Sequence, residues 1–155
     1  MRGLALFIPT LALVTNSCRE SVGLDVLPPP SFRVLPSTVA PGDSFAVVFT
    51  LRNPTDRTVS ITSGAGCLFF LRAFQDSSEI SVQGLTYFCT AGFRTFQVPP
   101  HDSLQAVRRG VAAERTGTAT GTPLRAGTYR IRTLMNAALP EMEAPLTVVD
   151  TGGAT

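Results

Sequence analysis

The sequence contains no lysine and only one histidine, and these two shortages exclude several kinds of chemistry. A phosphate-binding P-loop needs a lysine after its second glycine, so the threonine- and glycine-rich stretch 116–122 indicates a loop between strands. A single histidine argues against zinc, whose sites usually draw several ligands from histidine and cysteine. We therefore predict no metal ion and no cofactor.

Basic charge is present but not concentrated. The 13 basic residues are all arginine and stand against 11 acidic residues, so the chain is close to neutral. Arg108 and Arg109 form the only adjacent basic pair. Proteins that bind nucleic acid usually carry a clustered basic excess, so we expect no nucleic-acid partner.

Hydrophobic runs are short as well. The apolar stretch over residues 3–14 cannot span a membrane as a helix, which takes about 20 residues. It follows Arg2 and precedes Cys18, an arrangement typical of a signal peptide, here over residues 1–17. We predict a lipoprotein exported to the bacterial cell envelope, with Cys18 as the site of lipid attachment to the membrane. Thr15 stands where lipoprotein signals usually have leucine, so a periplasmic or secreted protein is the alternative.

Cysteine is scarce, with three residues in the chain. An odd number in an exported protein leaves one thiol over, and lipidation of Cys18 would account for it. Cys67 and Cys89 then remain for one disulfide. Closing that loop would stabilise the fold by about 3 kcal/mol in the chain-entropy description.

Residues 18–31 are predicted to form a tether, because the prolines at 28–30 favour an extended, semi-rigid spacer. One folded domain is predicted over residues 32–150, followed by a disordered tail at 151–155. Within the domain, apolar residues alternate with polar ones over short runs that are separated by turn residues. The strand candidates are centred on 32–35, 45–52, 59–61, 67–74, 80–82, 87–88, 96–98, 104–111, 129–135 and 146–148.

This pattern predicts an all-β fold, an immunoglobulin-like antiparallel β-sandwich of about seven to eight strands. The absence of tryptophan removes one hallmark of antibody domains. No window shows the 3.6-residue periodicity of a helix. Loops at 75–92 and 112–126 are the candidate contact regions, since exposed loops commonly carry binding functions.

The run His101-Asp102-Ser103 contains the three residue types of a serine hydrolase triad, but in consecutive positions. Triad members converge from separate segments, and no nucleophile-elbow motif is present. We therefore interpret residues 99–103 as a turn with a hydrogen-bonding aspartate. The carboxylates show no strongly paired spacing either, so we predict no catalytic residue and no enzyme activity.

Four stretches together resemble the intracellular proteinase inhibitor family, which acts on subtilisin-like proteases. They are FAVVFTLRNPTDRTVSI at 45–61, SGAGCLFFLRAF at 63–74, VPPHDSLQAV at 98–107 and LRAGTYRIRTLM at 124–135. The resemblance implies an immunoglobulin-like sandwich. His101 departs from the glycine that is usual in the family's turn, and no reactive-loop motif carries an inhibitory residue over.

The leading functional prediction is a non-enzymatic, envelope-tethered binding or accessory domain of unknown ligand. Its partners would be the membrane, through Cys18, and an envelope protein or protease. The alternative prediction is a proteinase inhibitor of exported subtilisin-like proteases.

Overall fold

The computed structural model describes residues 27–64, 66–85, 89–115, 121–135 and 139–150. The predicted signal peptide, Cys18 and the tail at 151–155 lie outside the described residues. Every regular element in the described part is a β-strand, so the predicted all-β class is confirmed. The strands are β1 Ser31–Leu35, β2 Thr38–Val39, β3 Ser44–Arg52, β4 Val59–Ser63, β5 Phe69–Gln75, β6 Ser78–Ile80, β7 Arg94–Val98, β8 Ser103–Val111, β9 Gly127–Met135 and β10 Glu143–Val148.

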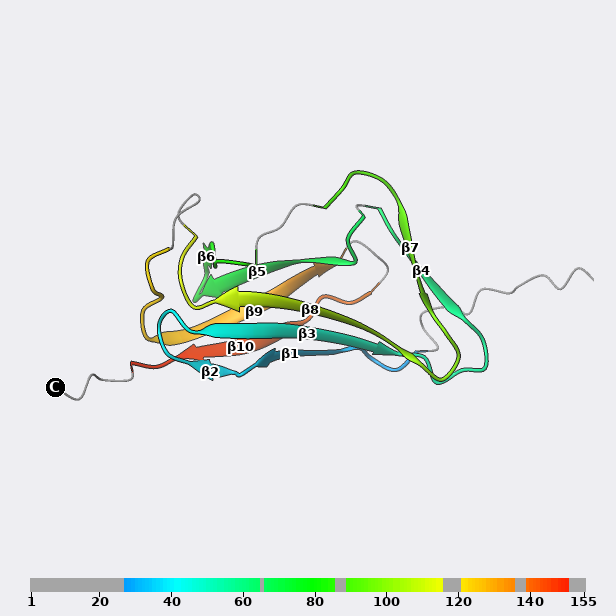
Figure 1. Ribbon diagram of the computed structural model, residues 1–155, viewed down its shortest axis with the longest axis horizontal. Helices are drawn as coiled ribbons and strands as arrows, with labels where there is room; N and C mark the ends of the chain where they lie inside the picture. The colour runs from blue at the N-terminus through cyan, green and yellow to red at the C-terminus, as the bar shows by residue number, and fades with distance from the viewer. Residues whose placement is uncertain (1–26, 65, 86–88, 116–120, 136–138, 151–155) are drawn as a thin grey trace, which may run out of the picture.

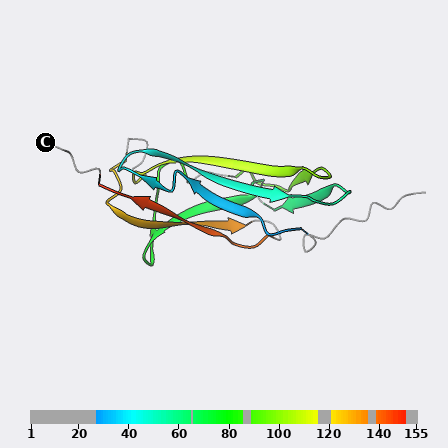
Figure 2. The same ribbon diagram turned by 90° about the horizontal axis from the view of Figure 1, so that it is seen from below.

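Two sheets form the body of the domain, and a two-stranded ribbon extends from one end (Figure 1). One sheet has the order β1-β3-β8, the other β2-β10-β9-β5-β6, and the ribbon is β4-β7. Figure 2 shows the two larger sheets stacked as layers. All strand pairs are antiparallel except β2 with β10, which run parallel, so the sandwich is mixed rather than wholly antiparallel.

The alternation in β3 gives one buried face and one outer face, as the sequence predicts. Phe45, Val47, Phe49 and Leu51 are all buried between the sheets. Phe45 lies directly across from Gly110 of β8, and a side chain on Gly110 would collide with its ring. A glycine at that position is what allows the phenylalanine to close the core.

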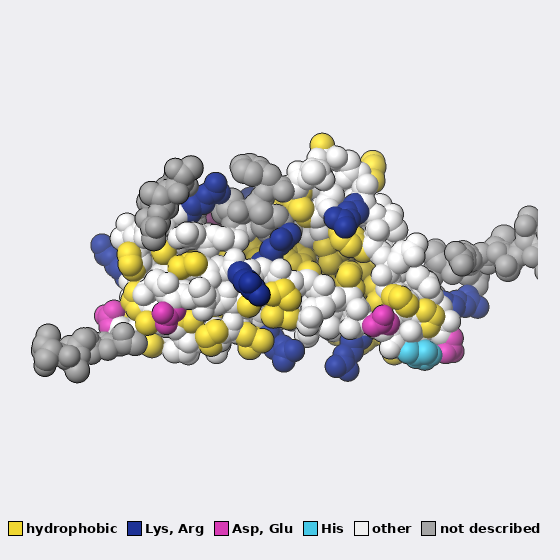
Figure 3. Space-filling view, viewed as in Figure 1, with side chains coloured by type: hydrophobic (Ala, Val, Ile, Leu, Met, Phe, Trp, Pro, Cys, Tyr) yellow, Lys and Arg dark blue, Asp and Glu magenta, His cyan; other side chains and the backbone are white. Residues whose placement is uncertain are grey.

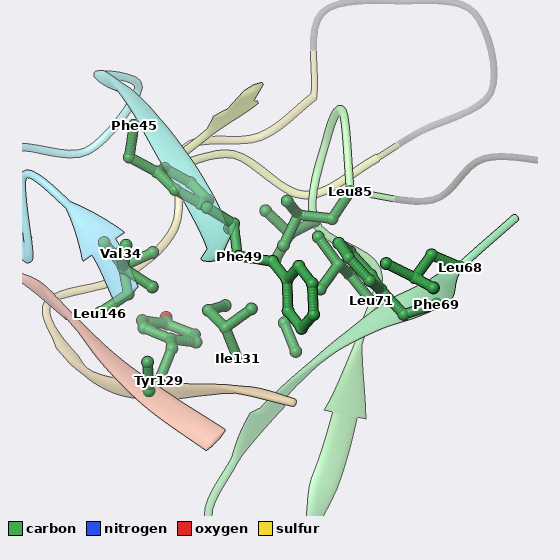
Figure 4. Packing of buried hydrophobic residues seen from close by; sticks show 14 of the residues in the cluster. Val34, Phe45, Phe49, Leu68, Phe69, Leu71, Leu85, Tyr129, Ile131 and Leu146 are labelled. Atoms are coloured by element: carbon green, nitrogen blue, oxygen red, sulfur yellow. The ribbon is translucent and has the colours of Figure 1, made fainter. Parts of the chain in front are cut away.

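Opposite β3, strands β5 and β9 supply the second face of the core. Phe69 packs a tilted ring against Phe49, with 5.3 Å between ring centroids (Figure 4). Tyr129 and Ile131 are also fully buried, and Figure 4 shows both pointing into the same interior. Each such side chain contributes about 1.5–3 kcal/mol through burial, so this contact between layers is the main source of stability.

The buried side chain of Tyr129 also brings a polar hydroxyl group to the start of β9. Its hydroxyl donates a hydrogen bond of 2.9 Å to the backbone carbonyl of Arg125, four residues earlier. Burial raises the pKa of this phenol above its ordinary value, and the charge of Glu114 adds to the rise. A tyrosine at the start of a late strand that bonds upstream backbone is the geometry of a tyrosine corner.

The chain changes sheets between β1 and β2. The peptide bond between Leu35 and Pro36 is cis at this point. β2 then joins β10, where the Thr147 amide donates to the Ser37 carbonyl at 2.8 Å. The sequence does not predict β2, because a strand of only two residues shows no alternation.

Most other predicted strands are confirmed with small shifts. Cys67 lies just before β5 rather than in it, and the 80–82 candidate is divided between β6 and a bridge from Val82 to Glu114. The candidate at 87–88 lies outside the described residues. Ser31, the last residue of the predicted tether, is the first residue of β1.

Candidate functional site

The disulfide forms as predicted and holds one end of the molecule. Cys67 and Cys89 are joined with 5.4 Å between their Cα atoms. The bond ties the segment between β4 and β5 to the segment before β7, and the Ser63 hydroxyl donates to the Cys67 carbonyl beside it. The β4/β7 ribbon is therefore anchored covalently to the strand that enters the core at Phe69.

Next to this anchor an aromatic side chain is almost entirely in solvent. Phe93 is 87% exposed, the largest exposure among the described large hydrophobic residues. It directly precedes β7, whose Arg94 guanidinium lies 5.1 Å from the centroid of the Phe96 ring. Figure 1 shows the chain that enters β7 arching away from the two sheets. A partner protein could bury this ring without rearrangement of the core.

The two loops predicted as contact regions are joined to each other. The Gln83 amide donates to the Ala113 carbonyl at 2.9 Å, and the Arg115 amide donates to the Ser81 carbonyl at 2.7 Å. Residues 86–88 and 116–120 within these loops lie outside the described part. The described remainder forms a small backbone-paired region at the end of β8, which the sequence does not predict.

At the opposite end of β8, two turns lie side by side around Asn53. This side chain is 1% exposed, and its amide nitrogen donates to the carbonyls of Arg57, Val98 and Pro99 at 2.7, 2.9 and 2.9 Å. Its backbone amide donates to the Asp102 carbonyl at 2.8 Å. One buried asparagine thus connects the turn after β3 with the turn after β7.

A shallow depression of about 410 Å³ lies at this corner, lined by Arg52, Asn53, Pro54, His101, Asp102 and Ser103. His101 Nε2 lies 2.8 Å from Asp56 Oδ1, and both side chains are exposed. The Asp102 carboxylate instead accepts from the amide of Ser103 at 2.7 Å. The interpretation as a turn with a hydrogen-bonding aspartate is confirmed, and the partner of His101 is a residue that the sequence does not single out.

The outer face of the five-stranded sheet carries paired charges. Nε and Nη2 of Arg132 both donate to one carboxylate oxygen of Glu143, at 3.1 and 2.9 Å, and its guanidinium lies 5.1 Å from the centroid of Phe74. Arg72 forms an ion pair with Glu79 at 3.2 Å. These half-exposed contacts pair both glutamates of the sheet with its arginines, so little unpaired charge is left to attract an incoming group.

Among the described residues, no group of three or more histidine, cysteine or acidic side chains is placed to hold a metal ion. No helix in the same part of the chain is long and apolar enough to cross a membrane.

Comparison with known proteins gives little further guidance. No protein-family model and no curated protein matches the chain. A β-glucosidase from Erythrobacter marinus aligns at 16% identity and a TM-score of 0.44, over 79% of this chain and 15% of its own. A Pseudomonas fluorescens alkylpurine DNA glycosylase aligns at 11% identity and a TM-score of 0.40, over 78% of this chain and 30% of its own. A β-glucosidase from Listeria innocua aligns at 12% identity and a TM-score of 0.38, over 91% of this chain and 21% of its own.

The chain therefore spans less than a third of each of these three structures. At these TM-scores the alignments carry no argument about its activity. The resemblance to the proteinase inhibitor family stays a prediction.

Proposed function

We propose that this chain is a non-enzymatic binding domain of the bacterial envelope, tethered through a lipid on Cys18. In this proposal the sandwich is immunoglobulin-like, which the hydrogen bond from Tyr129 to Arg125 supports. The Cys67–Cys89 disulfide is consistent with an oxidising, exported compartment, because such bonds seldom persist in a reducing cytosol.

The exposure of Phe93 carries the proposal. Leaving a phenylalanine 87% in water forgoes about 1.5–3 kcal/mol of burial, and a partner could recover that free energy. Aromatic and arginine side chains dominate the energetics of protein interfaces, and Arg94 follows at the next position. The disulfide holds this segment in place before binding, which lowers the entropic cost of association.

Site-specific crosslinking in cells tests the binding function. A photoreactive phenylalanine analogue at position 93 should capture a defined envelope protein. The same analogue at exposed Thr128, in β9 of the five-stranded sheet, is the matched control. Phe93→Ser should remove partner binding and leave the melting temperature unchanged. Equal capture at both positions, or no capture at either, would contradict Phe93 as the contact.

The tether has its own test. The intact mass of protein from the membrane fraction should correspond to a chain that begins at Cys18 and carries acyl groups. Soluble, unacylated protein would remove the anchor from the proposal and leave the binding domain in the periplasm or outside the cell.

The alternative, inhibition of exported subtilisin-like proteases, is separable by assay. An inhibitor lowers protease activity at stoichiometric amounts and survives the incubation uncut, whereas a binding domain of another kind does neither.

A further inference from the structure

The two layers differ sharply in charge. Strands β1, β3 and β8 of the three-stranded sheet contain four arginines and no acidic residue, namely Arg33, Arg52, Arg108 and Arg109. The strands of the other sheet contain three arginines together with Glu79 and Glu143, which pair with them. Figure 3 shows basic side chains over the middle of the first of these faces, with hydrophobic side chains between them and acidic side chains toward its two ends.

Three of these four arginines have no ionic partner in the described part of the chain: Arg33, Arg52 and Arg109. Strand register places them on the outer face, where Val107 is 49% and Leu35 48% exposed. The face therefore combines unneutralised positive charge with exposed apolar surface. That combination fits a partner whose contact segment is acidic and partly apolar.

β8 is also the last strand of its sheet, so one of its edges faces outward. The Val111 amide donates to the Gln83 carbonyl, so it points away from β3. Because alternate residues of a strand direct their backbone groups to the same side, the amides and carbonyls of Gln105 and Val107 also point away from β3. No described residue hydrogen-bonds to the backbone of these two on that side.

The open part of this edge has defined limits. Toward the end of β8 the Arg109 carbonyl lies against Gly84, where a Cβ atom in place of the glycine hydrogen would come within 2.5 Å of the carbonyl oxygen. At the beginning, β8 starts at Ser103, directly after the turn in which the Asp102 amide donates to the Pro99 carbonyl. Between these points, Leu104 and Ala106 are half-buried against the core. The available edge is a short segment with apolar side chains toward the interior and arginines nearby.

We infer that the edge of β8 receives an extended, acidic segment of a partner protein as an added strand. Backbone bonds to Gln105 and Val107 would supply the pairing, which is a common way to recognise extended peptides. Carboxylates on the outer face of the incoming strand would lie near Arg109. A second copy of this chain is a poorer occupant, because it would place two acid-free, arginine-bearing sheets side by side.

The inference rests on the proposed binding function, and synthetic peptides test it on the full chain purified in detergent. The probes are a short peptide of alternating glutamate and valine, the same peptide with lysine for glutamate, and one of alternating glutamate and proline. We expect only the glutamate–valine peptide to bind and to slow amide exchange at Gln105 and Val107. Proline lacks the donor that strand addition needs.

Charge reversal locates the site. Arg109→Glu should weaken binding of the glutamate–valine peptide by at least about tenfold, because a like charge would face the ligand. Arg72→Glu on the other sheet makes the same change in net charge and should leave the affinity within about twofold, since its position is remote from β8. Melting curves of both variants confirm that they fold.

Several results would overturn the inference. Equal binding of the glutamate–proline peptide would indicate unspecific charge attraction, and protection confined to other strands would place the site elsewhere. Protection at Gln105 that grows with protein concentration without peptide would make a second copy the occupant. If Phe93 crosslinks a partner while no peptide binds, the β8 site fails and the binding function stands; if neither occurs, both fail.

Discussion

The side-chain amide of Asn53 donates a 2.9 Å hydrogen bond to the carbonyl of Val98, which lies 45 residues away in the sequence. This contact fixes the corner at which β3 turns into β4 and β7 turns into β8. Asn53 also accepts bonds from the backbone amide and the hydroxyl of Thr55, so both ends of its amide are occupied. A residue that ends a strand in the sequence is thus a buried link between two distant turns.

Replacing Asn53 with alanine should lower the free energy of unfolding by about 3 kcal/mol, because the buried carbonyl of Val98 and the partly buried carbonyl of Pro99 would lose their donor. Urea denaturation measures the change, with exposed Gln105→Ala as the control. Asn53→Asp should lower the free energy of unfolding further at neutral pH. The difference from the native protein should shrink on acidification, because only the protonated carboxylic acid can donate a hydrogen bond. A loss within the error of the control would show that the two turns hold without this link.

Tyr129→Phe should cost about 1 kcal/mol through loss of its bond to Arg125. The native protein should also lose stability as the pH rises through and above about 10. Burial raises the pKa of Tyr129 in the folded state, so the unfolded chain gives up this proton first and is favoured at high pH. Melting temperatures from about pH 8 to about pH 11, a range around the ordinary tyrosine pKa, measure this, and the phenylalanine variant should show the shallower decline. Parallel curves would mean that the phenol ionises without penalty.

Removing the disulfide with Cys67→Ser and Cys89→Ser together should cost about 3 kcal/mol, the loop-closure value for a sequence separation of 22 residues. In a calorimeter, the reduced native protein should have the same melting temperature as the double variant. A double variant as stable as the oxidised protein would show that packing alone orders the ribbon end.

Gly110→Ala should cost about 1–3 kcal/mol, because the new methyl group would come within 2.6 Å of the Phe45 ring and 3.1 Å of Leu85. Gly64→Ala is a suitable comparison, since its methyl group would meet only Phe93, at 3.9 Å. Chemical denaturation of the two variants should separate them clearly. Equal stabilities would mean that Phe45 can move aside without loss.

The elements that can be predicted are those whose alternation is long. β3 and β5 each place three or more apolar residues on one face, β9 adds Tyr129 and Ile131, and the register of burial follows. β2 has two residues and no pattern of its own; it exists because β10 offers an edge beside it. The disulfide is predictable because assigning Cys18 to lipid attachment, itself a prediction, leaves two cysteines to pair.

The site residues are less accessible to sequence reasoning. His101 stands out as the only histidine, but its partner Asp56 is brought close only by the pairing of β4 with β7, which no local pattern specifies. Phe93 is an ordinary apolar residue in sequence, and its exposure follows from where the disulfide holds the chain. The open edge of β8 depends on the order of strands across a sheet, which is a property of the whole fold.

The parallel pairing of β2 with β10 has a mechanical consequence. Both strands run in the same direction, and the chain enters the sheet through one and leaves through the other. Tension applied between the two ends would slide these strands past each other, so the bonds from Thr147 to Ser37 and from Val149 to Val39 would bear the load together rather than open one by one. A domain on a stretched tether would resist pulling in this geometry, and single-molecule force spectroscopy would record that resistance as one high rupture event.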